Sequence, residues 1–213
     1  MVACDIRVGC GGWWCFPGGL RHYRLHFSFV EVNTAYYALP PEARLKEWRR
    51  IAGSPEEFEF SLKAPRSTPK TLKESFPKLV EAARILEARY VVVHASQPGW
   101  AELAVRLLDA GFTPVIVPAP PTRGRMSVEK KEGLPRGFLR VWDPVFENPP
   151  QAPTYARVFG APTGGVAHHL GSGMLKAASE RLTRALHLAG SVRVVVHTYR
   201  MAEDARRLMQ LLP

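Results

Sequence analysis

The sequence contains no long apolar run and few cysteines. No uninterrupted apolar stretch approaches the ~20 residues that span a bilayer, and Asp5 and Arg7 lie where a signal peptide needs its apolar segment. The three cysteines all fall within the first fifteen residues, at spacings that fit no zinc pair. A secreted disulfide framework is therefore excluded, and we expect a cytoplasmic protein without a membrane partner.

Positive charge, by contrast, is in excess. Among 213 residues, Lys and Arg total 29 and Asp and Glu total 19, which gives a formal net charge of +10. Apolar residues make up 46% and charged residues 23%, the mix of an ordinary globular domain. The charge favours an anionic partner, either a phosphorylated small molecule or nucleic acid. The 19 prolines and the preference for Arg over Lys indicate a thermophilic source.

Eight short segments rich in Val, Ile and Phe recur along the chain, and most are followed by a helical pattern. Several are almost continuous in these residues, as in strands that are buried on both faces of a parallel sheet. The predicted strands cover 6–10, 29–33, 58–64, 90–95, 114–118, 138–142, 155–159 and 193–197. The predicted helices cover 41–51, 76–88, 101–110, 175–189 and 201–212.

This alternation predicts a parallel α/β protein that forms a single domain over residues 1–213. A TIM-barrel-like (β/α) barrel fits eight strands, in a trimmed form because ~250 residues is more typical. The alternative is a doubly wound open sheet, but Gly9, Gly11 and Gly12 lack G-x-G-x-x-G spacing. We therefore predict the trimmed barrel. Segment 118–137, rich in Pro, Lys and Arg, is predicted to be a mobile surface loop.

Polar side chains gather where the predicted strands end, which is the edge at which barrel enzymes hold their active sites. Their number in this sequence predicts a functional pocket. The catalytic candidates are Glu31, Lys63, His94, Asp143 and His197, and the anion-binding candidates are Asn33, Lys63, Arg66 and Arg157.

Structural roles remain open for several of these residues. Glu31 lies in an apolar strand and needs a partner, which Lys63 or Arg157 would supply as a buried ion pair. Lysine is seldom buried without a partner or a task. Lys63 therefore suggests a phosphate anchor, or a Schiff-base nucleophile if burial lowers its pKa. His94 and His197 also suggest a metal site with nearby carboxylates, but no H-x-H or H-x-x-x-H spacing supports one, and we predict none.

Aromatic residues follow several of the predicted strands. They either form the apolar wall of the pocket or stack on bases or sugars. The set comprises Trp13, Trp14, Phe16, Tyr36, Tyr37 and Trp100. Cys10 ends the first strand, where an inert buried thiol is the favoured interpretation.

Three motifs, in order along the chain, resemble the YecE-like family, catalogued as domain of unknown function 72. They are VGCGGW at 8–13, VEVNTAYY at 30–37 and FSLKA at 60–64. Later segments resemble a divergent, archaeal-type branch: WDPVF at 142–146, YARVFG at 155–160 and HTYRMAEDA at 197–205. The resemblance implies a TIM-barrel-like fold with a polar pocket at the strand C-termini, and no established activity.

The chain departs from this family at specific positions. VIVPAP at 115–120 replaces the family's W-E-x-R motif, and Phe159 replaces a histidine. His94 stands in place of a glutamine, and His197 and Thr198 stand in place of an Asn pair. If the missing Glu and Arg are catalytic in relatives, this chain either binds without catalysis or uses its two histidines instead.

These observations predict an enzyme of hydrolase or lyase type that acts on a phosphorylated or nucleic-acid-like substrate. Lys63 and Arg157 would bind the anion, Glu31 or Asp143 would act as acid or base, and a histidine would carry a second proton. One alternative is a non-catalytic protein that binds nucleic acid or a metabolite through the pocket and the basic segment 123–140. Another is a scaffold with a relic pocket. Neither a cofactor nor an oligomeric state follows from these residues.

Overall fold

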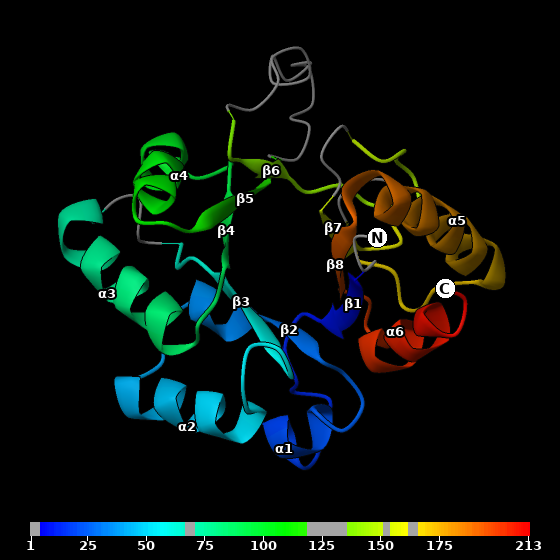
Figure 1. The fold of residues 1–213 in the computed structure, drawn as a ribbon, viewed down its shortest axis with the longest axis horizontal. Coiled ribbons are helices and arrows are strands. Elements are labelled where there is room, and N and C mark those ends of the chain that lie inside the picture. The colour runs from blue at the N-terminus through cyan, green and yellow to red at the C-terminus, as the bar shows by residue number, and fades with distance from the viewer. Residues whose placement is uncertain (1–4, 67–70, 119–135, 151–153, 162–165) are drawn as a thin grey trace.

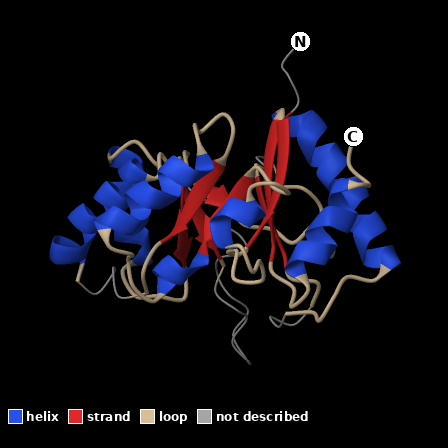
Figure 2. Cartoon of the chain, turned by 90° about the horizontal axis from the view of Figure 1, so that it is seen from below, coloured by secondary structure: helices blue, strands red, loops and turns tan. Residues whose placement is uncertain are grey.

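The computed structural model describes residues 5–66, 71–118, 136–150, 154–161 and 166–213. Its centre is an eight-stranded parallel sheet that curls into a nearly closed barrel, with helices outside it (Figures 1 and 2). The strands are β1 (Asp5–Cys10), β2 (Phe29–Val32), β3 (Glu59–Lys63), β4 (Tyr90–His94), β5 (Thr113–Val117), β6 (Leu139–Arg140), β7 (Tyr155–Val158) and β8 (Ser191–Val196). The helices are α1 (Gly19–Tyr23), η1 (Asn33–Tyr36), α2 (Glu42–Ala52), α3 (Leu72–Ile85), α4 (Trp100–Asp109), α5 (Ser172–Ala189) and α6 (Met201–Met209).

The strand order β6-β5-β4-β3-β2-β1-β8-β7 leaves β6 and β7 at the two edges of the sheet. The residues that follow β6 join these edges. Val141 donates its backbone N–H to Ile116 O at 2.9 Å, and Arg157 donates its backbone N–H to Trp142 O at 3.0 Å. Trp142 also forms a parallel bridge with Ala156. The trimmed TIM-barrel-like fold is therefore confirmed, and the doubly wound alternative is wrong.

Alternation along the strands separates two apolar layers. In β4, Val91 and Val93 pack in the large cluster that includes helix residues, whereas Tyr90 and Val92 belong to a second cluster. That second cluster also holds Phe29, Val115, Tyr155 and Val195, one from each of several strands, and it fills the barrel interior. Because side chains alternate along a strand, the next inward position after Phe29 is Glu31, after Tyr155 is Arg157 and after Val195 is His197. The polar site is thus the top layer of the barrel interior.

The structure differs from the sequence predictions at several helices: η1 was not predicted, and α5 begins at Ser172 rather than at residue 175. The five-residue helix α1 was not predicted, because it is short and follows closely after Pro17. Helix α3 begins at Leu72 rather than at residue 76, and Pro77 lies inside it in the second turn instead of at its start. Most of the predicted mobile loop 118–137, and of the basic segment 123–140, lies outside the described residues. Within the described ranges, no helix is long and apolar enough to cross a membrane.

Candidate functional site

Glu31 forms a buried ion pair across the barrel. Its Oε1 lies 2.9 Å from Nη2 of Arg157, and the two side chains are 0% and 2% exposed. The Tyr155 hydroxyl donates to Glu31 Oε2 at 3.0 Å and lies 2.7 Å from Ser61 Oγ. Burial raises the pKa of Glu31, but the charge of Arg157 and the contact with His197 outweigh it, so the pKa lies below its usual value. Glu31 is therefore a fixed carboxylate, and Arg157 rather than Lys63 is its ion-pair partner.

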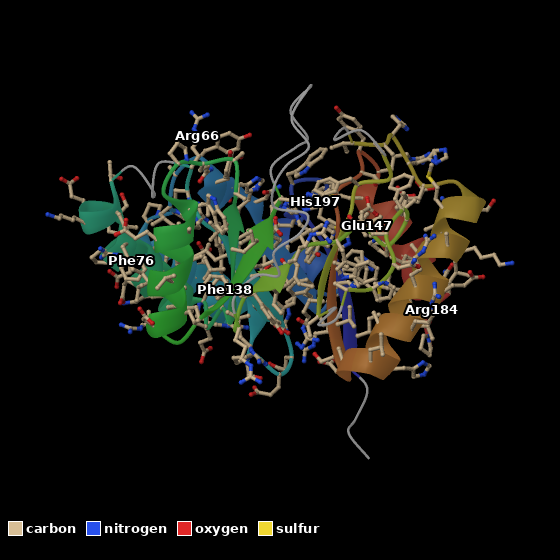
Figure 3. The ribbon with its side chains drawn as sticks, turned by 90° about the horizontal axis from the view of Figure 1, so that it is seen from above. Arg66, Phe76, Phe138, Glu147, Arg184 and His197 are labelled. Carbon is tan, nitrogen blue, oxygen red and sulfur yellow. The ribbon has the colours of Figure 1, made fainter. Side chains whose placement is uncertain are left out.

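His197 lies beside this pair as a neutral ring. Arg157 Nε donates to His197 Nε2 at 2.9 Å, so the ring carries its proton on Nδ1. Burial and the charge of Arg157 lower the pKa of His197 to about 4. Phe159 stacks on the imidazole at 5.1 Å between ring centroids. In Figure 3, His197 lies near the centre of the molecule, whereas Arg66 lies at its outer edge.

Gly11 leaves room for the His197 ring. A Cβ atom at position 11 would lie 2.5 Å from His197 Nδ1 and Cε1, and 3.2 Å from Asn33 Nδ2. Real Cβ atoms do not approach a ring this closely, so any side chain at this position would displace the imidazole. The VGCGGW motif therefore needs glycine at position 11 to make room for the His197 ring.

Lys63 ends β3 at the floor of a pocket. The side chain is 8% exposed, and Nζ lies 4.3 Å from the centroid of the Tyr36 ring. Among the described residues it has no carboxylate within ion-pair distance. Burial and the charge of Arg157 lower the pKa of Lys63 to about 8, although Glu31 opposes the shift. Lys63 is therefore a cation that loses its proton readily near neutral pH.

The pocket above Lys63 has a volume of about 390 Å³ and opens at the ends of β1, β2 and β3. Five aromatic side chains form most of its wall, and Trp48 reaches it from helix α2. Trp14 and Tyr37 are 72% and 73% exposed. Trp13 packs edge-on against Trp48 at 4.7 Å between ring centroids. The lining residues are Gly11, Gly12, Trp13, Trp14, Asn33, Thr34, Tyr36, Tyr37, Trp48 and Lys63.

His94 ends β4 next to this pocket. Its ring lies 5.3 Å from the Tyr36 ring, and its Nε2 is buried without a hydrogen-bond partner in the described part of the chain. Burial, with the charges of Lys63 and Arg157, lowers the pKa of His94 to about 3. The ring is therefore neutral near pH 7, and its Nε2 has no hydrogen-bond partner among the described residues.

Asp143 and Arg66 have other surroundings. The Asp143 carboxylate accepts backbone N–H groups from Val145 at 2.9 Å, Phe159 at 3.0 Å and Gly160 at 3.4 Å. Burial raises the pKa of Asp143, and those N–H groups oppose the rise. The carboxylate holds two loops together and does not line the pocket. Arg66 is exposed, with its guanidinium 5.9 Å from the Tyr37 ring. Catalytic roles for Asp143 and the other candidates stay predictions.

Three contributors to the site were not singled out from the sequence. Ser61 and Tyr155 share the inward face of their strands with Lys63 and Arg157, and this two-residue period was the available signal. Trp48 carried no such signal, because an aromatic residue on an amphipathic helix normally indicates core. In the described ranges no three His, Cys, Asp or Glu side chains are arranged to hold a metal ion.

The aromatic residues and Cys10 can also be placed. Phe16 is buried and packs on Tyr23 and Phe27, and it does not line the pocket. Cys10 is buried, and burial raises the pKa of its thiol, as expected of an inert cysteine.

Comparison with known proteins agrees with this architecture. A DUF72 family protein from Enterococcus faecalis V583 has a TM-score of 0.71 at 19% identity, over 97% of each chain. An uncharacterized protein from Parabacteroides distasonis ATCC 8503 has a TM-score of 0.54 at 14% identity, over 97% of this chain and 98% of that one. No curated protein matches the sequence. The family model described as protein of unknown function DUF72 matches residues 17–129. That match covers more than half of the chain, and the protein belongs to the DUF72 family.

Proposed function

We propose that this protein is an enzyme of lyase or hydrolase type that acts on a small phosphorylated or nucleotide-like substrate in the aromatic pocket. The observation that carries the proposal is Lys63, a buried cation that lines an aromatic pocket and has no carboxylate in ion-pair range among the described residues. Pockets of this size hold small molecules, with a few polar groups fixing their orientation.

The charges at the barrel end favour an anionic ligand. Lys63 and Arg157 are both cations, Glu31 supplies one negative charge, and His94 and His197 are neutral. Arg157 Nη1 also lacks a partner among the described residues. The layer therefore carries about one unmatched positive charge while Lys63 is protonated. A phosphate or carboxylate bound in this layer, which also holds the unpartnered Arg157 Nη1, would supply the missing negative charge, and would raise the pKa of Lys63.

The pocket wall favours a ligand with a flat ring or a sugar. Stacking of a base on an aromatic side chain contributes about 1–3 kcal/mol per base. Trp14 and Tyr37 expose ring surface on the pocket, and Asn33 Oδ1 is a buried acceptor without a partner in the described ranges. A nucleotide or another phosphorylated ring compound combines the charge and the shape that this pocket offers.

The arrangement of proton-carrying groups favours lyase over hydrolase chemistry. Glu31 is held ionised by Arg157, and Asp143 is occupied by backbone N–H groups, so neither supports the acid–base role predicted from the sequence. Lys63, with a pKa of about 8, remains as the group in the pocket that exchanges a proton near neutral pH. Because Glu31 and Asp143 are both engaged, a second candidate function is also favoured, namely a protein that binds the ligand without catalysis.

Thermal unfolding with candidate ligands tests the pocket. At 100 times its Kd, a ligand adds about 2.7 kcal/mol of stability, or roughly 5–10 °C in Tm for a chain of this size. Nucleoside 5′-monophosphates are expected to stabilise the protein more than the matching nucleosides or inorganic phosphate. The shift should disappear in Lys63→Met and persist in Lys46→Met, because Lys46 is exposed and paired with Glu42. Full retention in Lys63→Met would overturn the assignment.

Turnover separates the two candidate functions. A stabilising compound is incubated with the protein and followed by phosphorus and proton NMR. Conversion that is lost in Lys63→Met supports the enzyme, whereas binding without conversion supports the binding protein. Stabilisation only by oligonucleotides, weakening steeply with salt, would instead indicate a nucleic-acid surface.

A further inference from the structure

We propose that Lys63 is a nucleophilic amine, and that the substrate carries an aldehyde or ketone with which it forms an imine. The proposal rests on the proposed function, since the pocket must first hold a small substrate, and it adds the reactive group of that substrate. The geometry behind it is a buried lysine at the floor of an aromatic pocket, with its amine free of any carboxylate among the described residues.

The surroundings of Lys63 suit a nucleophile better than a structural cation. Its nearest carboxylate in the barrel, Glu31, is already bound by Arg157 and Tyr155. Lys46 shows the opposite arrangement, because its Nζ lies 2.5 Å from Glu42 and the pair is on the surface. The face of the Tyr36 ring stabilises a cation at Nζ without neutralising it. The same face stabilises a protonated imine, which also carries a positive charge.

The protonation state agrees with this role. At pH 7.5, a pKa of about 8 leaves about a quarter of the Lys63 amines unprotonated. A lysine with the ordinary value of about 10.5 has only about 0.1% in that form. Nucleophilicity falls as pKa falls, with a Brønsted slope of about 0.5 for thiols. If the same slope holds for amines, the larger unprotonated fraction outweighs the lower nucleophilicity, and Lys63 reacts about tenfold faster than an exposed lysine.

The reaction balances without a further reagent. The Nζ lone pair attacks the carbonyl carbon, the π electrons move to the oxygen, and a proton passes from nitrogen to oxygen to give a carbinolamine. The hydroxyl group then leaves as water after taking one more proton, and the carbon–nitrogen double bond forms. Solvent water in the open pocket takes up and supplies these protons. The protonated imine withdraws electrons from the neighbouring carbon, as cleavage of a bond there requires.

Reductive trapping tests the imine directly. The protein is incubated at pH 7.5 with pyridoxal 5′-phosphate, an aldehyde with a flat ring and a phosphate, and the imine is reduced with sodium borohydride. Peptide mapping by mass spectrometry then compares Lys63 with the exposed lysines Lys46, Lys73, Lys78 and Lys176 of the same molecule. Lys63 is expected to react about tenfold faster than these. Equal or slower labelling of Lys63 would overturn the proposal, and this comparison needs no variant.

Two further arms separate this proposal from the proposed function. If nucleoside monophosphates stabilise the protein but Lys63 is not labelled preferentially, the imine is wrong and the anion pocket stands. If unphosphorylated pyridoxal labels Lys63 equally fast and no phosphorylated compound stabilises the protein, the imine stands and the phosphate is wrong. Lys63→Arg keeps the charge but has no lysine amine. It is expected to keep nucleotide stabilisation and to lose site-specific trapping.

Discussion

Replacing Glu31 with glutamine removes a negative charge from the layer that holds the cations Arg157 and Lys63. Glu31→Gln preserves the shape of the side chain and its ability to accept a hydrogen bond from Tyr155. It leaves Arg157, which is 2% exposed, without a counter-charge. Because a cation cannot be left unpaired in the barrel interior without cost, we expect a large loss of stability.

The size of this loss follows from the burial of the pair. Breaking a buried ion pair by removing one partner costs about 3–5 kcal/mol. For a chain of this length, each kcal/mol lowers the Tm by about 2–4 °C, so the expected decrease is roughly 6–20 °C. The matched control is Glu47→Gln, since Glu47 pairs with Arg44 on the surface with 41% of its side chain exposed. That change should stay within about 0.5 kcal/mol.

A double-mutant cycle makes the prediction specific to the pair. Urea unfolding followed by tryptophan fluorescence gives the free energy of unfolding for Glu31→Gln, Arg157→Met and the double variant. Each single change leaves one buried charge, whereas the double variant leaves neither. The double variant should therefore be more stable than the sum of the single losses predicts, by about 2–3 kcal/mol. A loss below 1 kcal/mol in Glu31→Gln, or strictly additive losses in the cycle, would show that Glu31 and Arg157 are not a stabilising buried pair.

Three other predictions concern the same site. Gly11→Ala should lower the free energy of unfolding in urea by about 1–3 kcal/mol, because its Cβ would lie 2.5 Å from the His197 ring. The control Gly173→Ala in α5 should not destabilise the protein, because nothing lies within 4 Å of that position. Equal effects of the two changes would contradict this prediction. The pKa of His197 falls from 6.5 to about 4 on folding, so the folded state binds fewer protons and stability decreases as pH falls from 6.5 to 4. In unfolding curves measured at a series of pH values, the free energy of unfolding of His197→Gln should fall less steeply with decreasing pH than that of the unchanged protein, by about 1 kcal/mol per pH unit. An unchanged slope would show that His197 is not buried as a neutral ring. Trp14→Ala should raise the Kd of a stabilising nucleotide about tenfold in calorimetry with little change in Tm, since Trp14 is 72% exposed; unchanged affinity would remove Trp14 from the binding surface.

Much of the fold was predictable because the parallel strands are chemically distinctive. Val91, Val92 and Val93 form a continuous apolar run, and such runs occur where helices cover one face and a barrel interior fills the other. Helix α1 escaped prediction because five residues carry too little periodicity to be recognised. The predicted start of α3 was too late in the chain. Pro77 lies in the second turn of this helix, whereas a proline is more often found at the first helical position.

The position of the site at the strand ends was predictable from the sequence, but the contacts among its side chains were less so. The rule that barrel strands present functional groups at their C-terminal ends placed Glu31, Lys63 and His197 together. The partner of Glu31 was open, because strand ends alone do not tell which side chains face each other across a barrel. Asp143 follows β6, yet its carboxylate turns to backbone N–H groups of its own and the next loop. Such local hydrogen bonds depend on loop geometry, which side-chain patterns do not encode.

A direct measurement of the Lys63 pKa shows whether this residue is a readily deprotonated lysine in a ligand pocket. The ¹³Cε resonance of Lys63, assigned with Lys63→Arg in protein carrying ¹³C-labelled lysine, is followed by NMR as a function of pH. We expect a titration midpoint of about 8 that rises when a stabilising nucleotide is added. A midpoint near the ordinary lysine value of 10.5, unmoved by nucleotides, would contradict it.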